Sequence, residues 1–160
     1  MRLFHMLCDA LLRFWFFIFD RLILYPALCY LSPVLGIQFL NLGYWPTDDS
    51  TKEEAQMKQI VEQCSSETDP DRPHYYLYER ALLVHPKYPA LEGLQLLEVG
   101  CGQGNGLKWL KKAHPEIKSL LGIDRCALKG TCTVPGDAHH LPCGDQQFDI
   151  EYTHMRTQMG

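Results

Sequence analysis

The sequence predicts an α/β protein with a Rossmann-like sheet of about four strands, preceded by an apolar and then an acidic helical region. Two observations favour this class. First, an apolar run at 94–99 enters a glycine cluster, and a helical pattern at 107–113 leaves it. Second, the next apolar run, 119–123, ends on the acid Asp124. Nucleotide-binding folds with open parallel sheets have the same order of elements: a strand, a glycine turn, a helix, and a second strand that ends on an acid.

The composition is that of an ordinary globular chain and excludes some classes. The chain has 160 residues, of which 46% are hydrophobic and 21% charged, so one domain is expected. A net charge of −4 without a basic run argues against a nucleic-acid partner. Seven cysteines without a C-x-x-C spacing favour a reducing, cytoplasmic setting. His139, His140 and Cys143 lack a second ligand pair, so no metal is expected.

Residues 1–47 form an apolar N-terminal region. On a helix, the polar residues of 1–20 would lie along one narrow stripe. The rest of the helix surface is apolar and should lie in a membrane interface or against a lipid substrate. Residues 22–47 carry no charge, but Pro26, Pro33 and Gly36 interrupt them. A transmembrane span, an interfacial or substrate-facing hairpin and an ordinary core remain open. The expected location is the cytoplasm or the cytoplasmic face of a membrane.

Residues 48–90 are expected to form a helical cap. Ser50 and Glu53 have the spacing of a capping box, and apolar residues then repeat with helical period over 51–64. Pro73 is well placed to begin a second helix, which should end before Pro86. Acids outnumber bases over 48–80, which is typical of solvated helix faces.

The glycine spacing discriminates between ligands. Counting from Gly100 or Gly102, the third glycine of a dinucleotide fingerprint G-x-G-x-x-G would fall on Asn105 or Leu107, so that reading fails. The actual pattern is E-x-G-x-G-x-G over 98–104. Such a turn places backbone N–H groups and a helix N-terminus against a ligand. Asp124 stands at about the distance from the turn at which nucleotide-binding folds hold ribose hydroxyls.

The run L-L-E-V-G-C-G-Q-G at 96–104 resembles the first motif of class I S-adenosylmethionine-dependent methyltransferases. N-x-G-Y-W at 41–45 resembles an element of lipid, sterol and tocopherol-type members, closest to the phthiotriol/phenolphthiocerol dimycocerosate methyltransferase-like group. G-D-A-x-x-L-P at 136–142 resembles the segment after the third strand, and the F-D of 147–150 resembles the start of the fourth.

The resemblance implies S-adenosylmethionine as cofactor and gives each matching residue a role, whereas the apolar N-terminal face suggests a hydrophobic small molecule or lipid as acceptor. No general base is assigned; His154 lies just past the fourth strand, but its surroundings do not match the family. The implied site residues are the turn residues Gly100, Cys101, Gly102 and Gly104 against methionine and ribose, Glu98 orienting the turn or meeting the ammonium, Asp124 on the ribose hydroxyls, Asp137 with Ala138 at the adenine amine, and Tyr44 and Trp45 covering cofactor and substrate.

The pattern departs from the family after Asp124. Only 13 residues lead from there to Asp137, too few for a helical crossover, so the intervening helix is expected to be missing or reduced to a turn. Residues 151–154 depart from the apolar strand expected there. We therefore expect residues 91–160 to form a partial S-adenosylmethionine-binding domain of a C-terminally truncated methyltransferase. The alternative is a non-catalytic, membrane-associated remnant.

Overall fold

The computed structural model describes residues 2–36, 38–39, 41–48, 51–125 and 132–153. These fall into two compact units, Met1–Gln38 and Phe39–Gly160. Each unit is described by itself. Ser50, His154 and the segment 126–131, where the crossover helix was predicted to be missing or reduced to a turn, lie outside the described residues.

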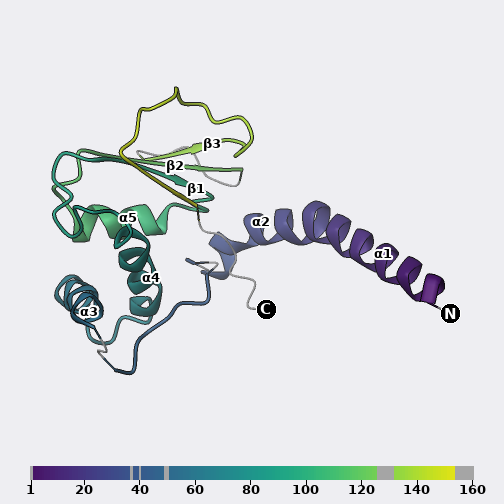
Figure 1. The fold of residues 1–160 in the computed structure, drawn as a ribbon, viewed down its shortest axis with the longest axis horizontal. Helices are drawn as coiled ribbons and strands as arrows, with labels where there is room; N and C mark the ends of the chain where they lie inside the picture. Colours follow the sequence, from purple (N-terminus) through teal and green to yellow (C-terminus); the bar gives the residue numbers. More distant parts are fainter. Residues whose placement is uncertain (1, 37, 40, 49–50, 126–131, 154–160) are drawn as a thin grey trace. The chain divides into compact units, whose positions relative to one another are not determined.

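The first unit is one continuous helical rod (Figure 1). Helix α1 (Arg2–Phe19) passes through a π-helical turn, η1 (Asp20–Leu24), into α2 (Tyr25–Leu35). The wider turn ends two residues before Pro26, whose ring would clash with the carbonyl four residues earlier in a regular α-helix. Helix α2 continues the direction of α1 and ends at Leu35. The hairpin weighed for residues 22–47 extends into the second unit and stays a prediction.

Large apolar side chains cover this rod. Phe14, Trp15 and Phe16 are consecutive and are exposed at 62%, 66% and 65%. Since consecutive helical residues lie about 100° apart, the apolar surface extends over more than one face. Among the described residues, no helix combines the length and the hydropathy needed to cross a membrane.

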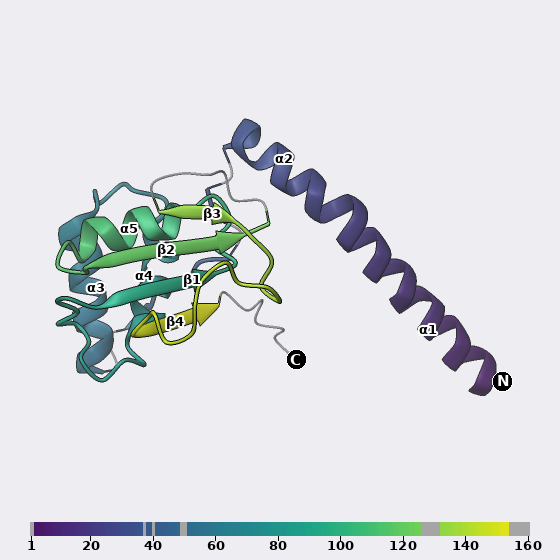
Figure 2. The ribbon, with the colours of Figure 1, turned by 90° about the horizontal axis from the view of Figure 1, so that it is seen from above.

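The second unit is built on a four-stranded sheet (Figure 2). Its strands are β1 (Gln95–Val99), β2 (Ser119–Asp124), β3 (Thr133–Pro135) and β4 (Ile150–Thr153). All pairings are parallel, and the spatial order is β3-β2-β1-β4. Order 3-2-1-4 is that of one end of a Rossmann sheet, so the predicted α/β class with an incomplete Rossmann-like sheet is confirmed.

Three helices lie on the same side of this sheet (Figures 1 and 2). They are α3 (Lys52–Cys64), α4 (Arg72–Leu82) and α5 (Asn105–Ala113), close to the predicted ranges. The N-cap of α3 is Thr51, whose hydroxyl accepts from the Glu54 N–H at 3.1 Å, one residue later than the predicted capping pair.

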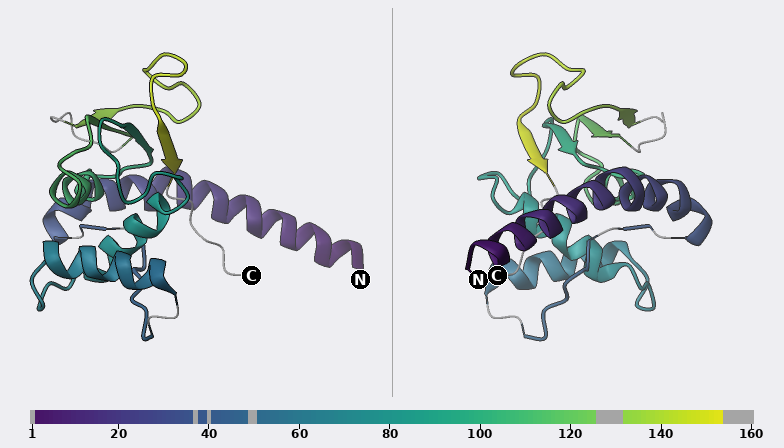
Figure 3. Two further views of the ribbon diagram at one scale, coloured as in Figure 1. Left: turned by 60° about the vertical axis from the view of Figure 1, so that its left-hand side comes forward. Right: turned by 90° about the vertical axis from the view of Figure 1, so that its right-hand side faces the viewer.

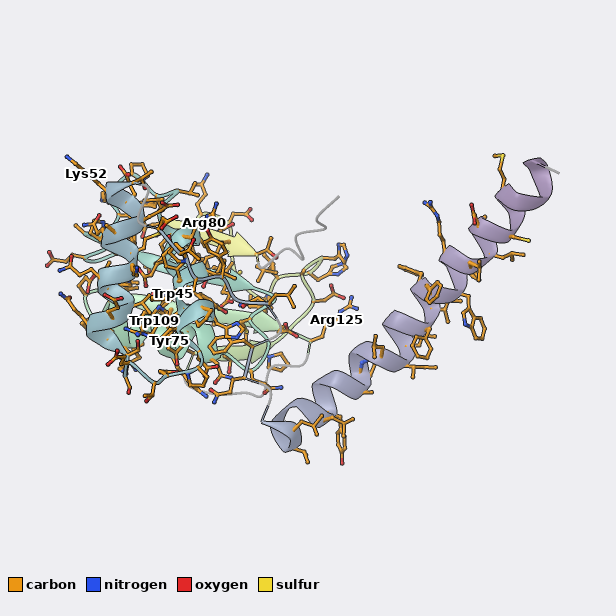
Figure 4. The ribbon with its side chains drawn as sticks, turned by 90° about the horizontal axis from the view of Figure 1, so that it is seen from below. Trp45, Lys52, Tyr75, Arg80, Trp109 and Arg125 are labelled. Carbon is orange, nitrogen blue, oxygen red and sulfur yellow. The ribbon has the colours of Figure 1, made fainter. Side chains whose placement is uncertain are left out.

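The core lies between these helices and the sheet. Tyr75 of α4 and Trp109 of α5 stack with ring centroids 4.2 Å apart, which joins the cap to the helix that follows the glycine turn (Figure 4). Leu96 of β1 belongs to this core, whereas its neighbour Leu97 is also fully buried but lies outside that cluster, as the alternation of side chains along a strand requires. The helices contribute Met57, Val61, Tyr76, Leu82, Leu107 and Leu110.

The fourth strand, β4, follows the F-D of 147–150 that was expected to begin it. Residues 151–153 depart from the apolar pattern of such a strand, yet they pair with β1 over Leu97–Val99. Glu151 and Thr153 are exposed while Tyr152 is partly buried, so the residues alternate as a one-sided edge strand requires. Figure 3 shows the loop between β3 and β4 extending beyond the sheet.

Candidate functional site

The turn between β1 and α5 needs its glycines. Gly100, Gly102 and Gly104 have φ of 85°, 54° and 74°, values that side-chain-bearing residues rarely adopt. A Cβ on Gly104 would also lie 2.5 Å from Cγ2 of Thr133 on β3. A Cβ on Gly102 would meet nothing within 4 Å. The turn is therefore packed against β3 at Gly104 and open at Gly102.

Backbone hydrogen bonds fix the turn at the carboxyl end of the sheet. The Gly100 N–H donates to the Ile123 carbonyl at 2.7 Å, and the Gly104 N–H donates to the Cys101 carbonyl at 2.9 Å. Gly104 is also the N-cap of α5. The N-terminus of that helix, with its partial positive charge, therefore stands at the end of the turn.

Asp124 meets this turn directly. One of its carboxylate oxygens, Oδ2, accepts a hydrogen bond from the Gly102 N–H at 2.9 Å, and the residue is only 6% exposed. The acid that ends β2 and the glycine turn after β1 thus share one edge of the sheet, which is where ligands bind in open α/β folds.

Glu98 lies behind the turn. It is fully buried, and Oε1 accepts a hydrogen bond from the Tyr78 hydroxyl of α4 at 2.9 Å. Burial raises the pKa of Glu98 to about 7; hydrogen bonds from Tyr78 and Tyr152 oppose that rise, and the charge of Asp124 adds to it. Of the two roles considered for Glu98, this arrangement favours orienting the turn.

Cys101 fills the space under the turn. Burial, followed by the charges of Glu98 and Asp124, raises the pKa of its thiol to about 12. A Cβ on Gly122 of β2 would lie 2.6 Å from the Cys101 sulfur. The residue therefore packs as a small neutral side chain.

Tyr78 and Tyr152 were missed from the sequence. Tyr78 stands on a helix and Tyr152 on the edge strand, 74 residues apart in sequence, and their rings meet edge to face at 6.2 Å. The hydroxyls of both tyrosines form hydrogen bonds with Glu98. A helical pattern indicates that Tyr78 faces inward, but nothing local in the sequence indicates which buried acid its hydroxyl will find.

Asp137 and Ala138 follow β3. The Gly136 N–H donates to the Asp124 carbonyl at 3.0 Å, which ties this segment to the end of β2. Asp137 pairs with Arg125 at 2.5 Å and accepts from the His139 N–H at 3.0 Å. The hydrogen bond from the His139 N–H lowers the pKa of Asp137 most, and the bond from Arg125 lowers it further. Ala138 is exposed. Arg125, labelled in Figure 4, was not singled out from the sequence.

The segment with Tyr44 and Trp45 packs on α4. Gly43 has φ of 69°, and a Cβ there would lie 2.9 Å from Cβ of Pro73. The Tyr44 N–H donates to the Pro73 carbonyl at 2.9 Å. Both rings contact Tyr76, and three cations stand over them, Arg80 over Tyr44 and Lys58 and Arg72 over Trp45. Packing on α4 thus explains why glycine and two aromatic residues follow one another in N-x-G-Y-W. The role of Tyr44 and Trp45 in covering cofactor and substrate stays a prediction.

Within the described part of the chain, no group of three His, Cys, Asp or Glu residues is placed to hold a metal ion. The three residues weighed for that role, His139, His140 and Cys143, lie in the loop between β3 and β4.

The fold and the turn define the class of protein: a Rossmann-like α/β chain with a glycine turn and an acid at the carboxyl edge of its sheet. The chain is also a homologue of the phthiotriol/phenolphthiotriol dimycocerosates methyltransferases, as its sequence resemblance predicted. It is 31% identical to the one from Mycobacterium leprae over 149 residues, 86% of this chain. It is 33% identical to methyltransferase 1 of Mycobacterium ulcerans and 34% identical to the Mycobacterium tuberculosis enzyme, each over 92 residues and 51% of this chain.

The chain spans 46% of the length of the Mycobacterium leprae relative and 32% and 33% of the other two. No family model matches the chain, and no solved structure matches it. The methyltransferase resemblance therefore depends on these relatives and on the motifs themselves.

Proposed function

We propose that this chain binds S-adenosylmethionine at the glycine turn and serves methyl transfer to a hydrophobic small molecule or lipid. The observation that carries the proposal is the hydrogen bond from the Gly102 N–H to the Asp124 carboxylate, which brings turn and acid to one edge. The residues fit the cofactor. The backbone at Gly102 has open space where a side chain would stand, and a carboxylate lies beside it.

Each site residue then has a defined task. The backbone at Gly100, Gly102 and Gly104 would pack against the methionine and ribose portions. Asp124 would accept hydrogen bonds from the ribose hydroxyls, and Asp137, with Ala138 beside it, would accept one from the adenine amine. Glu98 would act from behind by orienting the turn, since it is fully buried.

When bound, the cofactor supplies a methyl group on a positively charged sulfur that is a good leaving group. The protein's work is to hold the reacting atoms in line and to exclude water. A hydroxyl acceptor also needs a proton acceptor nearby. No such base is among the residues assigned above.

Calorimetric titration of the chain with S-adenosylmethionine tests cofactor binding. NAD is the matched control, because the turn lacks the dinucleotide spacing. Saturable binding of S-adenosylmethionine but not of NAD is expected. No binding of S-adenosylmethionine, or equal binding of both, would remove the proposal.

Methyl transfer needs its own assay. Tritiated S-adenosylmethionine is incubated with the chain and phthiotriol dimycocerosate in detergent micelles, and label in the lipid fraction is counted. Labelled lipid supports transfer to this lipid class. Intact cofactor binding without transfer would favour the alternative of a non-catalytic remnant.

We further propose that the first unit places the chain on the cytoplasmic face of a membrane or against a lipid acceptor. The support is the exposed aromatic run Phe14–Phe17 on α1, because water does not favour so continuous an apolar surface. The relatives are named for a lipid substrate, which agrees with a hydrophobic acceptor.

Flotation with phosphatidylcholine vesicles tests the membrane proposal. A variant with Phe14→Ser, Trp15→Ser and Phe16→Ser should remain at the bottom of the gradient. The control carries Leu42→Ser and Val84→Ser, two residues that are 97% and 87% exposed on the second unit. It should float with the parent chain. If the triple variant floats as well as the control, the proposal is wrong.

A further inference from the structure

Tyr78 connects helix α4 to the acid that precedes the glycine turn. Its hydroxyl donates to Oε1 of Glu98 at 2.9 Å, and its side chain is only 4% exposed. Glu98 stands two residues before Gly100, where the turn begins. The hydroxyl therefore fixes the last part of β1 from outside the strand.

The ring of Tyr78 also fixes the other end of the turn. A Cβ on Gly106, in the first turn of α5, would lie 1.9 Å from Cζ of Tyr78 and 2.0 Å from its hydroxyl oxygen. The ring thus packs directly on the α5 backbone. Phe39 contacts the same ring edge to face at 6.2 Å, so the segment that precedes the cap contacts it as well.

We propose that Tyr78 is a positioning residue for the glycine turn: from α4 it holds both the acid that ends β1 and the first turn of α5, so that cofactor affinity at the turn depends on the helical cap. The inference rests on the proposed function, since it concerns the same ligand. It assigns Tyr78 no contact with the cofactor.

The charge on Glu98 gives this role a specific signature. Four groups face Glu98: the Tyr78 hydroxyl from α4, the Tyr152 hydroxyl from β4, the Asp124 carboxylate from β2 and the Cys101 thiol of the turn. The hydroxyls favour its ionised form, whereas burial and Asp124 oppose it. S-adenosylmethionine carries a positive sulfonium, so an ionised Glu98 should favour its binding.

The test compares Tyr78→Phe with Tyr88→Phe. Both changes remove a tyrosine hydroxyl from a buried glutamate, since the Tyr88 hydroxyl donates to Oε2 of Glu79 at 2.7 Å. Of these two tyrosines, it is Tyr78 whose hydroxyl and ring contact the residues on either side of the turn, Glu98 and Gly106. Affinity for S-adenosylmethionine is measured by calorimetry from pH 6 to 8.5. At pH 7, Tyr78→Phe should weaken binding about tenfold, the effect of one charge-assisted hydrogen bond, and should move the midpoint of the pH profile upward.

Tyr88→Phe should leave affinity and midpoint as in the parent chain. In a Glu98→Gln background, adding Tyr78→Phe should change affinity less than twofold, because the titrating partner is gone. If Tyr78→Phe does not fold, Tyr152→Phe, which removes the other hydroxyl from Glu98, must raise the midpoint in its place.

Equal affinities and midpoints for Tyr78→Phe and Tyr88→Phe would overturn this inference while leaving the proposed function intact. A parent chain that does not bind S-adenosylmethionine at any pH would overturn both. The two failures are therefore distinguished by the parent titration alone.

Discussion

The Asp124 carboxylate accepts a hydrogen bond from the Gly102 backbone N–H at 2.9 Å, across 22 residues of sequence. This contact joins the ends of two neighbouring strands, since Gly102 follows β1 and Asp124 closes β2. It orients the acid toward the turn before any ligand is present. Such pre-orientation lowers the entropy that a ligand must lose on binding.

Replacing Asp124 should therefore weaken cofactor binding selectively. Asp124→Asn keeps the shape but loses the charge, and the expected loss of S-adenosylmethionine affinity is about tenfold to a hundredfold by calorimetry. Asp149→Asn is the control, because Asp149 also accepts a backbone N–H, that of Gln95 at 2.8 Å, before β4 begins. Equal affinities of the two variants would contradict a ribose-binding role for Asp124.

The contact between Gly106 and Tyr78 predicts that one added methyl group at Gly106 strongly destabilises the folded chain. Gly106→Ala would place a methyl group 1.9 Å from Cζ of Tyr78, within a core that cannot expand freely. We expect a loss of about 3 kcal/mol or more in the free energy of unfolding, measured with urea.

Gly93→Ala is the matched comparison for that experiment. Gly93 has φ of 75° but nothing within 4 Å of its missing Cβ, so only backbone strain should arise, about 1 kcal/mol. A Gly106→Ala variant no less stable than Gly93→Ala would show that the Tyr78 ring does not lie against α5.

Glu98 predicts a pH dependence of stability. The pKa of Glu98 is about 7 in the folded chain and 4.5, the ordinary value, in the unfolded chain. Between these two values the folded state therefore binds more protons than the unfolded state. Stability should therefore fall as pH rises from 4.5 to above 7, by about 3 kcal/mol from this group. Urea unfolding at pH 5 and pH 8 measures it. Glu98→Gln should show a smaller fall; an equal fall would assign the dependence elsewhere.

A second buried acid, Glu79, holds the far end of α5. It is fully buried and accepts from Trp109 Nε1 at 3.0 Å and from the Tyr88 hydroxyl at 2.7 Å, while His114 Nε2 lies 2.9 Å away. Glu79→Ala leaves these groups without their shared partner. The expected cost is about 3–5 kcal/mol in urea unfolding.

Glu116→Ala is the control for Glu79. Glu116 also contacts His114, at 3.2 Å, but its side chain is 33% exposed, so its loss should cost about 1 kcal/mol or less.

Burial alone would lower the pKa of His114, but the hydrogen bonds and charges of Glu79 and Glu116 outweigh it and raise that pKa. This contribution is present at low pH and is lost as pH rises through the raised value. Similar costs for both variants would contradict a central role for Glu79.

Local patterns predicted the elements around the turn well. The apolar run before Gly100, the helical period after it and the acid after 119–123 each depend on neighbours within a few residues, and β1, α5 and β2 appear within a residue or two of the predicted ranges. The left-handed φ of Gly102 and Gly104 likewise follows from the residue type. The homology to lipid methyltransferases was also predicted, from motifs taken in order.

Contacts between distant segments could not be predicted in the same way. The hydrogen bond from Tyr78 to Glu98 and the ion pair between Arg125 and Asp137 depend on how helices and loops are placed around the sheet. The extent of the fourth strand could not be read from residues 151–153, because they lack the apolar pattern of a buried strand and an edge strand needs only alternating burial. The roles of the individual site residues remain predictions.

Glu79 and the glycine turn stand at opposite ends of one short helix. Gly104 precedes α5 and His114 follows its nine residues, a separation of about 15 Å along the helix axis. The buried contacts that stabilise this layer thus lie at one end of α5, and the proposed ligand site lies at the other. Substitutions in the turn that alter the proposed ligand specificity should therefore leave the Glu79 contacts unchanged.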